Sequence, residues 1–365
     1  MKNTLISLFL FAALPFSSHL ENKTKIDPRL ITGNVFIITT DGFRWQEVFT
    51  GADSSLVNNE NYTPDTATVK ALYWAPDATE RRKKLMPFFW SVINAKGQIY
   101  GNRSFNNKVN VANPYAISYP GYNEIFTGNT DPGFSSNAKN DNPNINVLEY
   151  LNAKPGFTGK VAAFTSWDVF PYILNENRNG LPVNSGYEAI NELKLSPGET
   201  TINKVQEELI NNKGATRYDG LTFISAREYL KQHTPRVLYL GLGETDEFAH
   251  QGRYDLYLDQ ANQVDKMIAE LWHWVQTTPG YKDNTTFIIT TDHGRGSKNS
   301  KWSSHGEFIK GSSQTWLAII GPKTRPLGEV REGEQLYQQQ IAQTIAHLVG
   351  EEFIADNIAP AVSVR

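Results

Sequence analysis

The sequence predicts an α/β protein with a mostly parallel central sheet that carries helices on both faces. The first observation is a pair of near-identical runs, NVFIITTDG at residues 34–42 and TFIITTDHG at residues 286–294. Continuous apolar and β-branched runs of this length are typical of strands that are buried on both faces. The second observation is that such runs alternate with helix-like segments along the whole chain. This alternation is the pattern of strand–helix–strand units.

Length, charge and composition narrow the classes of function. The chain has 365 residues, a formal net charge of -3 and no cysteine. Its length suffices for one large α/β domain with an ample core. The near-neutral charge argues against a nucleic-acid polymer as the partner. Without cysteine, any metal must be held by Asp, Glu, His, Asn or hydroxyl groups.

The N-terminal segment predicts export. Residues 1–18, MKNTLISLFLFAALPFSS, combine an early Lys2, an apolar stretch and two small serines, which is the pattern of a secretory signal peptide. We expect residues 19–33 to form a leader segment and residues 34–365 a single α/β domain. No later stretch of the sequence approaches the ~20 apolar residues of a membrane span. The expected location is therefore the periplasm or the outside of the cell.

The remaining elements follow from local patterns of apolar and turn-forming residues. We expect strands at 34–40, 160–165, 237–241, 287–290 and 315–320. We expect helices at 80–96 with a break at Pro87, and at 144–152, 203–212, 220–232, 254–276 and 334–349, and we expect a loop followed by a helix within 115–127. Residues 52–79 are polar and predict a loop, and residues 167–198 predict an irregular aromatic segment. Insertions near 52–96 and 167–233 are expected to build a small cap.

Acids and histidines follow three of the predicted strands. They are Asp41, then Asp246 with His250, then Asp292 with His293. Asp246 and His250 are four residues apart and share one face of a helical turn, and His305 follows His293 by a short loop. Ligands bind at the carboxyl edge of open α/β sheets, and oxygen and nitrogen donors suit zinc. Each residue alone is more often a turn acid or a packed histidine, but the ordered set predicts a metal site.

A candidate nucleophile lies between the first two of these groups. Ser118 stands in AISYPGYNEIFTG, two residues before Pro120 and at the start of a predicted helix. The N-terminus of a helix attracts anions, and metal coordination would lower the pKa of the hydroxyl. The alternative is that Ser118 only caps the helix.

The order of these residues resembles the alkaline phosphatase superfamily, and within it the nucleotide pyrophosphatase/phosphodiesterase branch. The shared pattern is a hydroxyl nucleophile two residues before a proline, a Thr-Gly pair that ends the same helix (here Thr127-Gly128), Asp-xxx-His, Asp-His-Gly and a late histidine. The resemblance implies an alkaline-phosphatase-like fold and two divalent ions, most simply zinc. It implies one ion on Asp246, His250 and His305, and the other on Asp41, Asp292, His293 and the Ser118 oxygen.

The same resemblance implies a hydrolase of small phosphorylated substrates that acts through a phosphoseryl intermediate on Ser118. It also implies an asparagine on the phosphoryl oxygens, for which Asn137 is the first candidate and Asn140 and Asn142 remain open. Tyr122 and Trp167, with Phe170 and Tyr172, predict an aromatic wall for a leaving group, although ordinary packing explains each of them equally well. The segment FTSWDVFPYI offers no basic residue, which favours diesters slightly over monoesters.

The alternatives are a phosphomonoesterase, then a sulfatase, which fits the sequence less well, and then a metal-binding protein; a phosphoglycerate mutase does not fit an exported chain of this length. A phosphomonoesterase would need a basic side chain, and Arg44 or Arg178 could supply it. A sulfatase requires an arginine where Tyr122 stands, and a metal-dependent phosphoglycerate mutase requires a large second domain. Serine replaces the usual threonine of the branch, and Gly121-Tyr122 replaces its usual Asn-His. Outside this superfamily, the chain could be a secreted metal-binding protein without catalysis.

Overall fold

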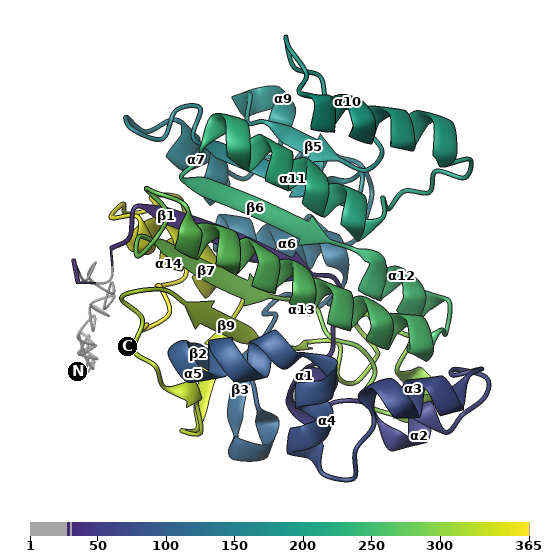
Figure 1. Ribbon diagram of the computed structural model, residues 1–365. Coiled ribbons are helices and arrows are strands. Elements are labelled where there is room, and N and C mark those ends of the chain that lie inside the picture. Colours follow the sequence, from purple (N-terminus) through teal and green to yellow (C-terminus); the bar gives the residue numbers. More distant parts are fainter. Residues whose placement is uncertain (1–27, 30, 365) are drawn as a thin grey trace, which may run out of the picture.

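The structure is a computed structural model that describes residues 28, 29 and 31–364 (Figure 1). The predicted signal peptide at 1–18 and residues 19–27 of the leader lie outside the described residues. Within the described part, no helix combines the length and the apolarity that crossing a bilayer requires.

The described chain is built on an eight-stranded sheet with the order β10-β2-β9-β7-β1-β6-β4-β5. The strands β7, β1, β6, β4 and β5 are parallel to one another, whereas β9 is antiparallel to β7 and to β2. The predicted α/β class is therefore confirmed, with a mixed edge on one side. The strands are β1 (Asn34–Thr40), β2 (Gln98–Tyr100), β4 (Val161–Thr165), β5 (Val183–Ser185), β6 (Val237–Leu242), β7 (Thr285–Thr290), β9 (Leu317–Ile320) and β10 (Gly328–Glu329). A second sheet pairs β11 (Glu334–Tyr337), β3 (Asn107–Asn110) and β8 (Gln314–Thr315).

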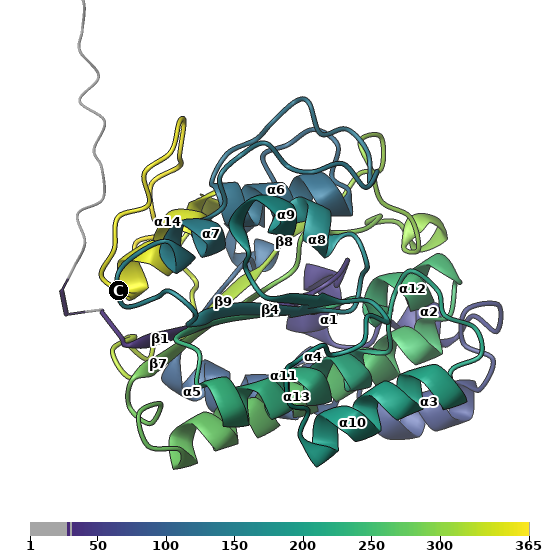
Figure 2. The ribbon, with the colours of Figure 1, turned by 90° about the horizontal axis from the view of Figure 1, so that it is seen from above.

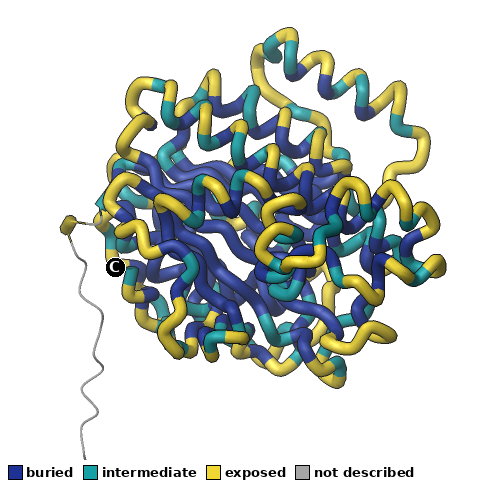
Figure 3. The backbone as a smooth tube through the Cα atoms, turned by 60° about the horizontal axis from the view of Figure 1, so that its bottom comes forward, coloured by how far each residue is buried: buried dark blue, intermediate teal, exposed yellow. Residues whose placement is uncertain are grey.

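Alternation along the strands divides the core into two layers. Val35 and Ile37 of β1 pack in one apolar cluster, and Phe36 and Ile38 pack in the other, because successive side chains of a strand point to opposite faces. All four side chains are at most 1 % exposed, and Figure 3 shows the buried strands at the centre of the molecule. The buried β-branched runs thus form a sheet that helices must cover on both sides.

Figure 2 shows the two helical layers on either side of the sheet. One cluster takes its helical residues from α1 (Trp45–Thr50), α2 (Ser54–Val57), α3 (Thr66–Tyr73), α4 (Ala78–Leu85), α11 (Asp219–His233), α12 (Glu244–His250) and α13 (Tyr254–Thr277). The other takes them from α6 (Ser118–Thr127), α7 (Val147–Asn152), α8 (Phe170–Ile173) and α14 (Gln340–Leu348). The remaining α-helices are α5 (Asn94–Lys96), α9 (Glu176–Asn179) and α10 (Pro197–Lys204).

Three expectations about local structure are wrong. Residues 52–79 contain α2 and α3, which begin where the side chains of Asp53 and Asp65 accept backbone N–H groups, so the helix-start signals were present in a polar segment. Residues 334–349 do not form one helix, because 334–337 pair with β3 and only then does α14 begin. The segment 167–198 is not wholly irregular, since it contains α8, α9 and the edge strand β5.

The register of the parallel strands places the predicted site. Thr40 of β1 is opposite Leu242 of β6, and Thr39 is opposite Thr290 of β7. The residues that follow these three strands therefore emerge side by side at the carboxyl edge of the sheet. Part of the cap segment expected near 167–233 is integrated into the central sheet and its core. β5 pairs with β4, and α11 supplies buried residues to the apolar cluster that contains Phe36 and Ile38.

Candidate metal centre and nucleophile

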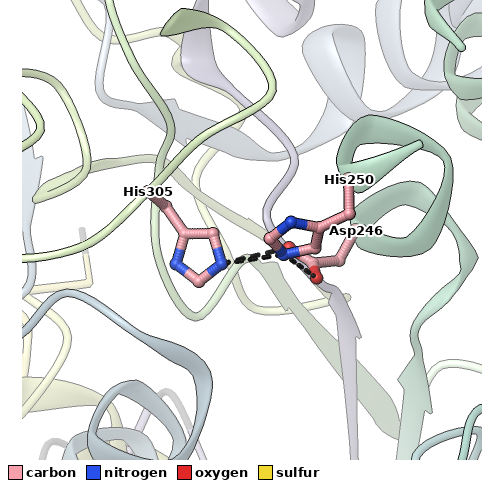
Figure 4. A group of neighbouring side chains, drawn as sticks. All are labelled: Asp246, His250 and His305. Atoms are coloured by element: carbon pink, nitrogen blue, oxygen red, sulfur yellow. Dashed lines mark hydrogen bonds and ion pairs between the residues drawn. The ribbon is translucent and has the colours of Figure 1, made fainter. Parts of the chain in front are cut away.

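The six predicted Asp and His ligands converge at this edge in two groups. Asp41 directly follows β1, Asp292 and His293 follow β7 after one intervening residue, and the three form one group. Asp246 and His250 lie on α12, after β6, and form the second group with His305 (Figure 4). Within each group the candidate ligand atoms all lie within 4.8 Å of one another. This is the same division that the resemblance implies.

The first group, Asp41, Asp292 and His293, is buried, and we call it the inner group. Two of its carboxylate oxygens have no hydrogen-bond partner in the described part of the chain and face one ring nitrogen. His293 Nε2 lies 3.5 Å from Asp41 Oδ1 and 3.4 Å from Asp292 Oδ2. These two carboxylate oxygens have no hydrogen-bond partner among the described residues. His293 Nδ1 lies 2.9 Å from the carbonyl oxygen of Gly294, and since a carbonyl only accepts, Nδ1 carries the proton and Nε2 a lone pair. Three lone pairs that face one point fit a divalent cation.

The electrostatics of the inner group also favour a cation. Burial raises the pKa of Asp41 well above its ordinary value, and the neighbouring Asp292 and Asp246 raise it further. Burial raises the pKa of Asp292 to about 8 and holds the pKa of His293 well below its ordinary value. Buried carboxylates this close repel one another, and a bound cation would offset both the repulsion and the loss of hydration.

The second group, which we call the outer group, combines the carboxylate of Asp246 with the imidazoles of His250 and His305. His250 Nε2 lies 3.0 Å from His305 Nε2 and 3.0 Å from Asp246 Oδ2. His305 Nδ1 lies 3.3 Å from the carbonyl oxygen of Ala116, so it is the protonated nitrogen and Nε2 faces His250 with its lone pair. Burial lowers the pKa of His305 to about 4, which keeps the ring neutral. Two nitrogens and one oxygen around one point again suit zinc.

Ser118 lies beside the inner group. Its Oγ is 3.3 Å from His293 Nε2, and the residue is 5 % exposed. Ser118 is the first residue of α6, the capping position falls on Ile117, and no side-chain hydrogen bond from that position caps the helix. The hydroxyl therefore faces the candidate ligands, which favours the nucleophile over the capping alternative.

Contacts in the structure account for Gly121 and Tyr122, which replace the Asn-His pair usual in the branch. A Cβ atom at Gly121 would lie 2.4 Å from the carbonyl oxygen of Asp292, so α6 can approach the end of β7 this closely only with glycine. The hydroxyl of Tyr122 donates to Asp41 Oδ2 at 3.0 Å, and its ring packs edge-on against Phe170. Tyr122 is 1 % exposed, so its position indicates support of Asp41, whereas we predicted contact with the substrate.

The three candidate asparagines occupy different surroundings. Asn137 is exposed, and its Oδ1 accepts the N–H of Tyr119, next to Ser118, at 3.0 Å. Asn142 is buried and donates its amide to Asn123, whereas Asn140 accepts the Tyr119 hydroxyl through its carbonyl oxygen. Asn137 is thus the candidate whose side chain reaches the N-terminus of α6.

Trp167, Arg44 and Arg178 are the remaining side chains that the sequence suggested for the substrate. Trp167 follows β4 at the ligand edge, is partly buried, and stands edge-on to Phe170 with ring centroids 6.2 Å apart. Arg44 is 1 % exposed and forms an ion pair with Glu47. Arg178 pairs with Glu149 at 2.7 Å. The guanidinium groups of Arg44 and Arg178 are therefore both held by other carboxylates.

Sequence reasoning missed two residues that shape the site. Arg295 directly follows Asp292-His293-Gly294 and forms an ion pair with Asp246. It lies in the polar loop between His293 and His305, where nothing in the local pattern sets it apart. Glu124, on α6, accepts the backbone N–H groups of Ala112 and Asn113. It thereby holds the loop that leads to Ser118, and nothing in the local pattern indicated this.

The Glu124 contact leads to a prediction about stability. Burial raises the pKa of Glu124 from 4.5 to about 7, although the N–H groups of Ala112 and Asn113 favour its charged form. The folded state therefore binds the proton more tightly than the unfolded state does. The resulting stability is fully present below pH 4.5 and is lost as the pH rises through 7, by up to about 3 kcal/mol.

The measurement is urea unfolding from pH 4 to 8 on metal-free protein, so that release of metal does not contribute. In Glu124→Gln this part of the pH dependence should disappear, so the difference in unfolding free energy between wild type and variant should change across pH 4.5–7 and level off below and above that interval. Parallel curves for the two proteins would show that Glu124 does not titrate in this range.

Comparison with known proteins agrees with this geometry. The profile of the family "Type I phosphodiesterase / nucleotide pyrophosphatase" matches residues 56–335, more than half of the chain. The chain belongs to this family. It is accordingly a phosphoric ester hydrolase of the alkaline phosphatase superfamily, as the resemblance predicted.

Solved structures show the same fold at low sequence identity. A mutant of alkaline phosphatase PafA has a TM-score of 0.60 and 10% identity, with coverage of 91% of this chain and 98% of that one. A putative sulfatase from Bacteroides thetaiotaomicron has a TM-score of 0.60 and 11% identity, with coverage of 91% and 74%. Phosphonate monoester hydrolase from Silicibacter pomeroyi has a TM-score of 0.54 and 13% identity, with coverage of 91% and 76%. A comparison with curated proteins by sequence finds no match.

Proposed function

We propose that the chain hydrolyses small phosphate esters through a phosphoseryl intermediate on Ser118, with a preference for diesters. The observation that carries this proposal is the position of Ser118 Oγ, 3.3 Å from His293 Nε2 and beside two groups of metal-type ligands. Two divalent ions, for which zinc suits the nitrogen and oxygen donors, would lower the pKa of the serine and stabilise the attacking and leaving oxygens. The residues of the chain position the substrate around that centre.

Transfer requires attack by Ser118 Oγ on phosphorus and departure of the leaving oxygen on the opposite side. A bond forms between Oγ and phosphorus while the bond from phosphorus to the leaving oxygen breaks, and water then cleaves the phosphoserine to restore Ser118. The N-terminus of α6 favours the negative phosphoryl oxygens. Asn137, whose side chain reaches that terminus, is suited to donate its amide to one of them.

The preference for diesters rests on the basic side chains around the site. A monoester carries an additional negative charge that a free Arg or Lys would have to bind. Among the described residues, Arg44 pairs with Glu47, Arg178 with Glu149, and Arg295 with Asp246. Lys139 pairs with Asp168 at 2.8 Å. With these charges engaged, the singly charged phosphoryl group of a diester is the better match.

An ester panel tests this proposal. Protein reconstituted with zinc is assayed with bis(p-nitrophenyl) phosphate, p-nitrophenyl phosphate and p-nitrophenyl sulfate under identical conditions. We expect the highest kcat/KM for the diester. A higher value for the monoester would favour the phosphomonoesterase alternative, and turnover of the sulfate alone would favour a sulfatase. No turnover of any ester, with zinc bound, would favour a metal-binding protein without catalysis.

We further propose that the protein is exported to the periplasm or secreted. The support is the sequence of residues 1–18, with its early lysine, apolar stretch and small residues. N-terminal sequencing of the protein from its native host tests this. Export requires that the mature chain begin after the apolar stretch, and a mature chain that begins at Met1 contradicts it.

A further inference from the structure

Arg295 places a positive charge inside the candidate metal centre. The residue is 1 % exposed, and its guanidinium donates to Asp246 Oδ1, to the carbonyl oxygen of Asp246 at 3.3 Å and to that of Ser303 at 2.6 Å. Its Nε has no hydrogen-bond partner among the described residues. The planar guanidinium therefore holds Asp246 by a side-chain and a main-chain oxygen at once, which fixes the orientation of that carboxylate.

The two oxygens of Asp246 have different surroundings. Oδ2 lies 3.0 Å from His250 Nε2, within the outer group. Oδ1 lies 3.9 Å from His293 Nε2 and 3.9 Å from His305 Nε2. Oδ1 is thus equally close to a histidine of the inner group and a histidine of the outer group. Without Arg295, this oxygen would be available to an ion in either group.

The backbone at Gly42 is shaped around the same ion pair. Gly42 has a φ of +58°, and a Cβ atom there would lie 2.6 Å from Asp246 Oδ1 and 2.9 Å from Arg295 Nε. Its N–H donates to Asp292 Oδ1 at 3.0 Å. A side chain at this position would collide with the pair, so the end of β1 leaves room for Arg295 and Asp246 while it orients an inner ligand.

We propose that Arg295 is a positioning residue that assigns Asp246 to the outer ion. The guanidinium occupies Oδ1, presents Oδ2 to the point shared by His250 and His305, and prevents Asp246 from joining Asp41, Asp292 and His293. This inference rests on the proposed two-ion function. Partners of metal ligands commonly change metal affinity by about 10- to 100-fold when they are replaced.

The loss of the arginine charge itself can be separated from the loss of positioning. Arg295 binds the oxygen that is equally distant from a histidine of each group, so removal of its charge affects the two ions to a similar extent. Release of Oδ1 affects them in opposite directions, because the inner ion gains a ligand that the outer ion loses. The ratio of the two affinities therefore reports positioning.

The test is zinc titration of metal-free protein in backgrounds that keep one group each. His293→Ala retains the outer group and His250→Ala retains the inner group. Arg295→Met is added to each background, because methionine has neither charge nor donors. We expect the outer-to-inner affinity ratio to fall about 10- to 100-fold, with partial recovery in Arg295→Lys, which keeps the charge but not the two-point contact.

Arg217→Met is the matched control. Arg217 is equally buried, and its guanidinium donates to Thr222, Asn184 and the carbonyl oxygen of Thr165, but to no candidate ligand. Its loss should lower thermal stability and leave the affinity ratio unchanged. An unchanged or increased ratio in Arg295→Met would overturn the positioning role. If wild type binds fewer than two zinc ions, the proposed two-ion function is wrong. This outcome is distinguishable from failure of the positioning role, because it is observed in wild type, without any change at Arg295.

Discussion

Replacement of Ser118 by alanine is expected to abolish ester hydrolysis and to leave the metal centre in place. The hydroxyl is the group that would form the covalent bond to phosphorus, and loss of a nucleophile lowers kcat on the order of 10⁴-fold or more. The six Asp and His ligands are unchanged by this substitution, since Ser118 contributes only a hydroxyl beside His293. The measurement is turnover of the preferred ester together with zinc content and thermal midpoint.

Ser225→Ala provides the control for loss of a buried hydroxyl. Ser225 is 1 % exposed and donates to the carbonyl oxygen of Leu221 within α11, away from the candidate ligands. This variant should retain wild-type turnover. If Ser118→Ala also retains full activity, another group attacks the substrate and the assignment of the nucleophile is wrong. If Ser118→Ala loses its zinc, the loss of activity results from loss of the metal. A different substitution must then separate the role of Ser118 as a nucleophile from its role as a metal ligand.

Asp292→Asn is expected to eliminate activity while it stabilises the metal-free protein. Asp292 Oδ1 accepts the N–H of Gly42, and asparagine can keep that bond, whereas Oδ2 has no hydrogen-bond partner among the described residues. Asparagine removes a buried negative charge next to Asp41, so the metal-free fold gains stability on the order of a few kcal/mol at alkaline pH. It also removes a ligand, so one zinc ion should be lost and turnover should fall with it.

The sign of this effect depends on pH. Burial raises the pKa of Asp292 in the folded protein to about 8, so wild type is most stable where the carboxyl is protonated and loses that stability as the pH rises through 8. The gain from Asp292→Asn should therefore be largest above pH 8 and vanish near pH 4. Urea unfolding of both metal-free proteins across this range measures it.

Asp265→Asn is the contrasting control. Asp265 is also buried, and its two oxygens accept the N–H groups of Phe88 and Phe89. No carboxylate is among the groups that shift its pKa. Asparagine turns one acceptor into a donor that faces an N–H group, so stability should fall. If Asp292→Asn destabilises the metal-free protein as Asp265→Asn does, Asp292 is a structural acceptor and the charge argument fails.

Much of the site followed from the sequence because its ligands sit at the ends of predictable strands. Buried β-branched runs at 34–40 and 285–290 are strong strand signals, and parallel strands bring the residues that follow them to one edge. Asp41 and Asp292 therefore meet although they are far apart in the chain. The division into two groups came from the resemblance, since spacing along the chain does not say which strands are neighbours.

Other features depended on tertiary contacts that no local pattern encodes. Residues 334–337 continue a helix-like pattern but pair with β3, so tertiary pairing prevailed over local propensity. Tyr122 looked like a substrate contact, but α6 turns it toward Asp41. Arg295 lies in a loop of polar sequence, but its side chain forms an ion pair with Asp246. In each case the decisive partner is distant in sequence.

We propose that Ser118 carries a phosphoryl group during turnover at a two-ion centre. The most direct measurement is rapid acid quenching of zinc-loaded enzyme with its preferred ester, followed by mass spectrometry of the peptide that contains residues 116–124. We expect a phosphoryl group on Ser118 that appears before steady state and decays as substrate is exhausted. Steady product formation with no phosphoryl group on Ser118 at any quench time would contradict it.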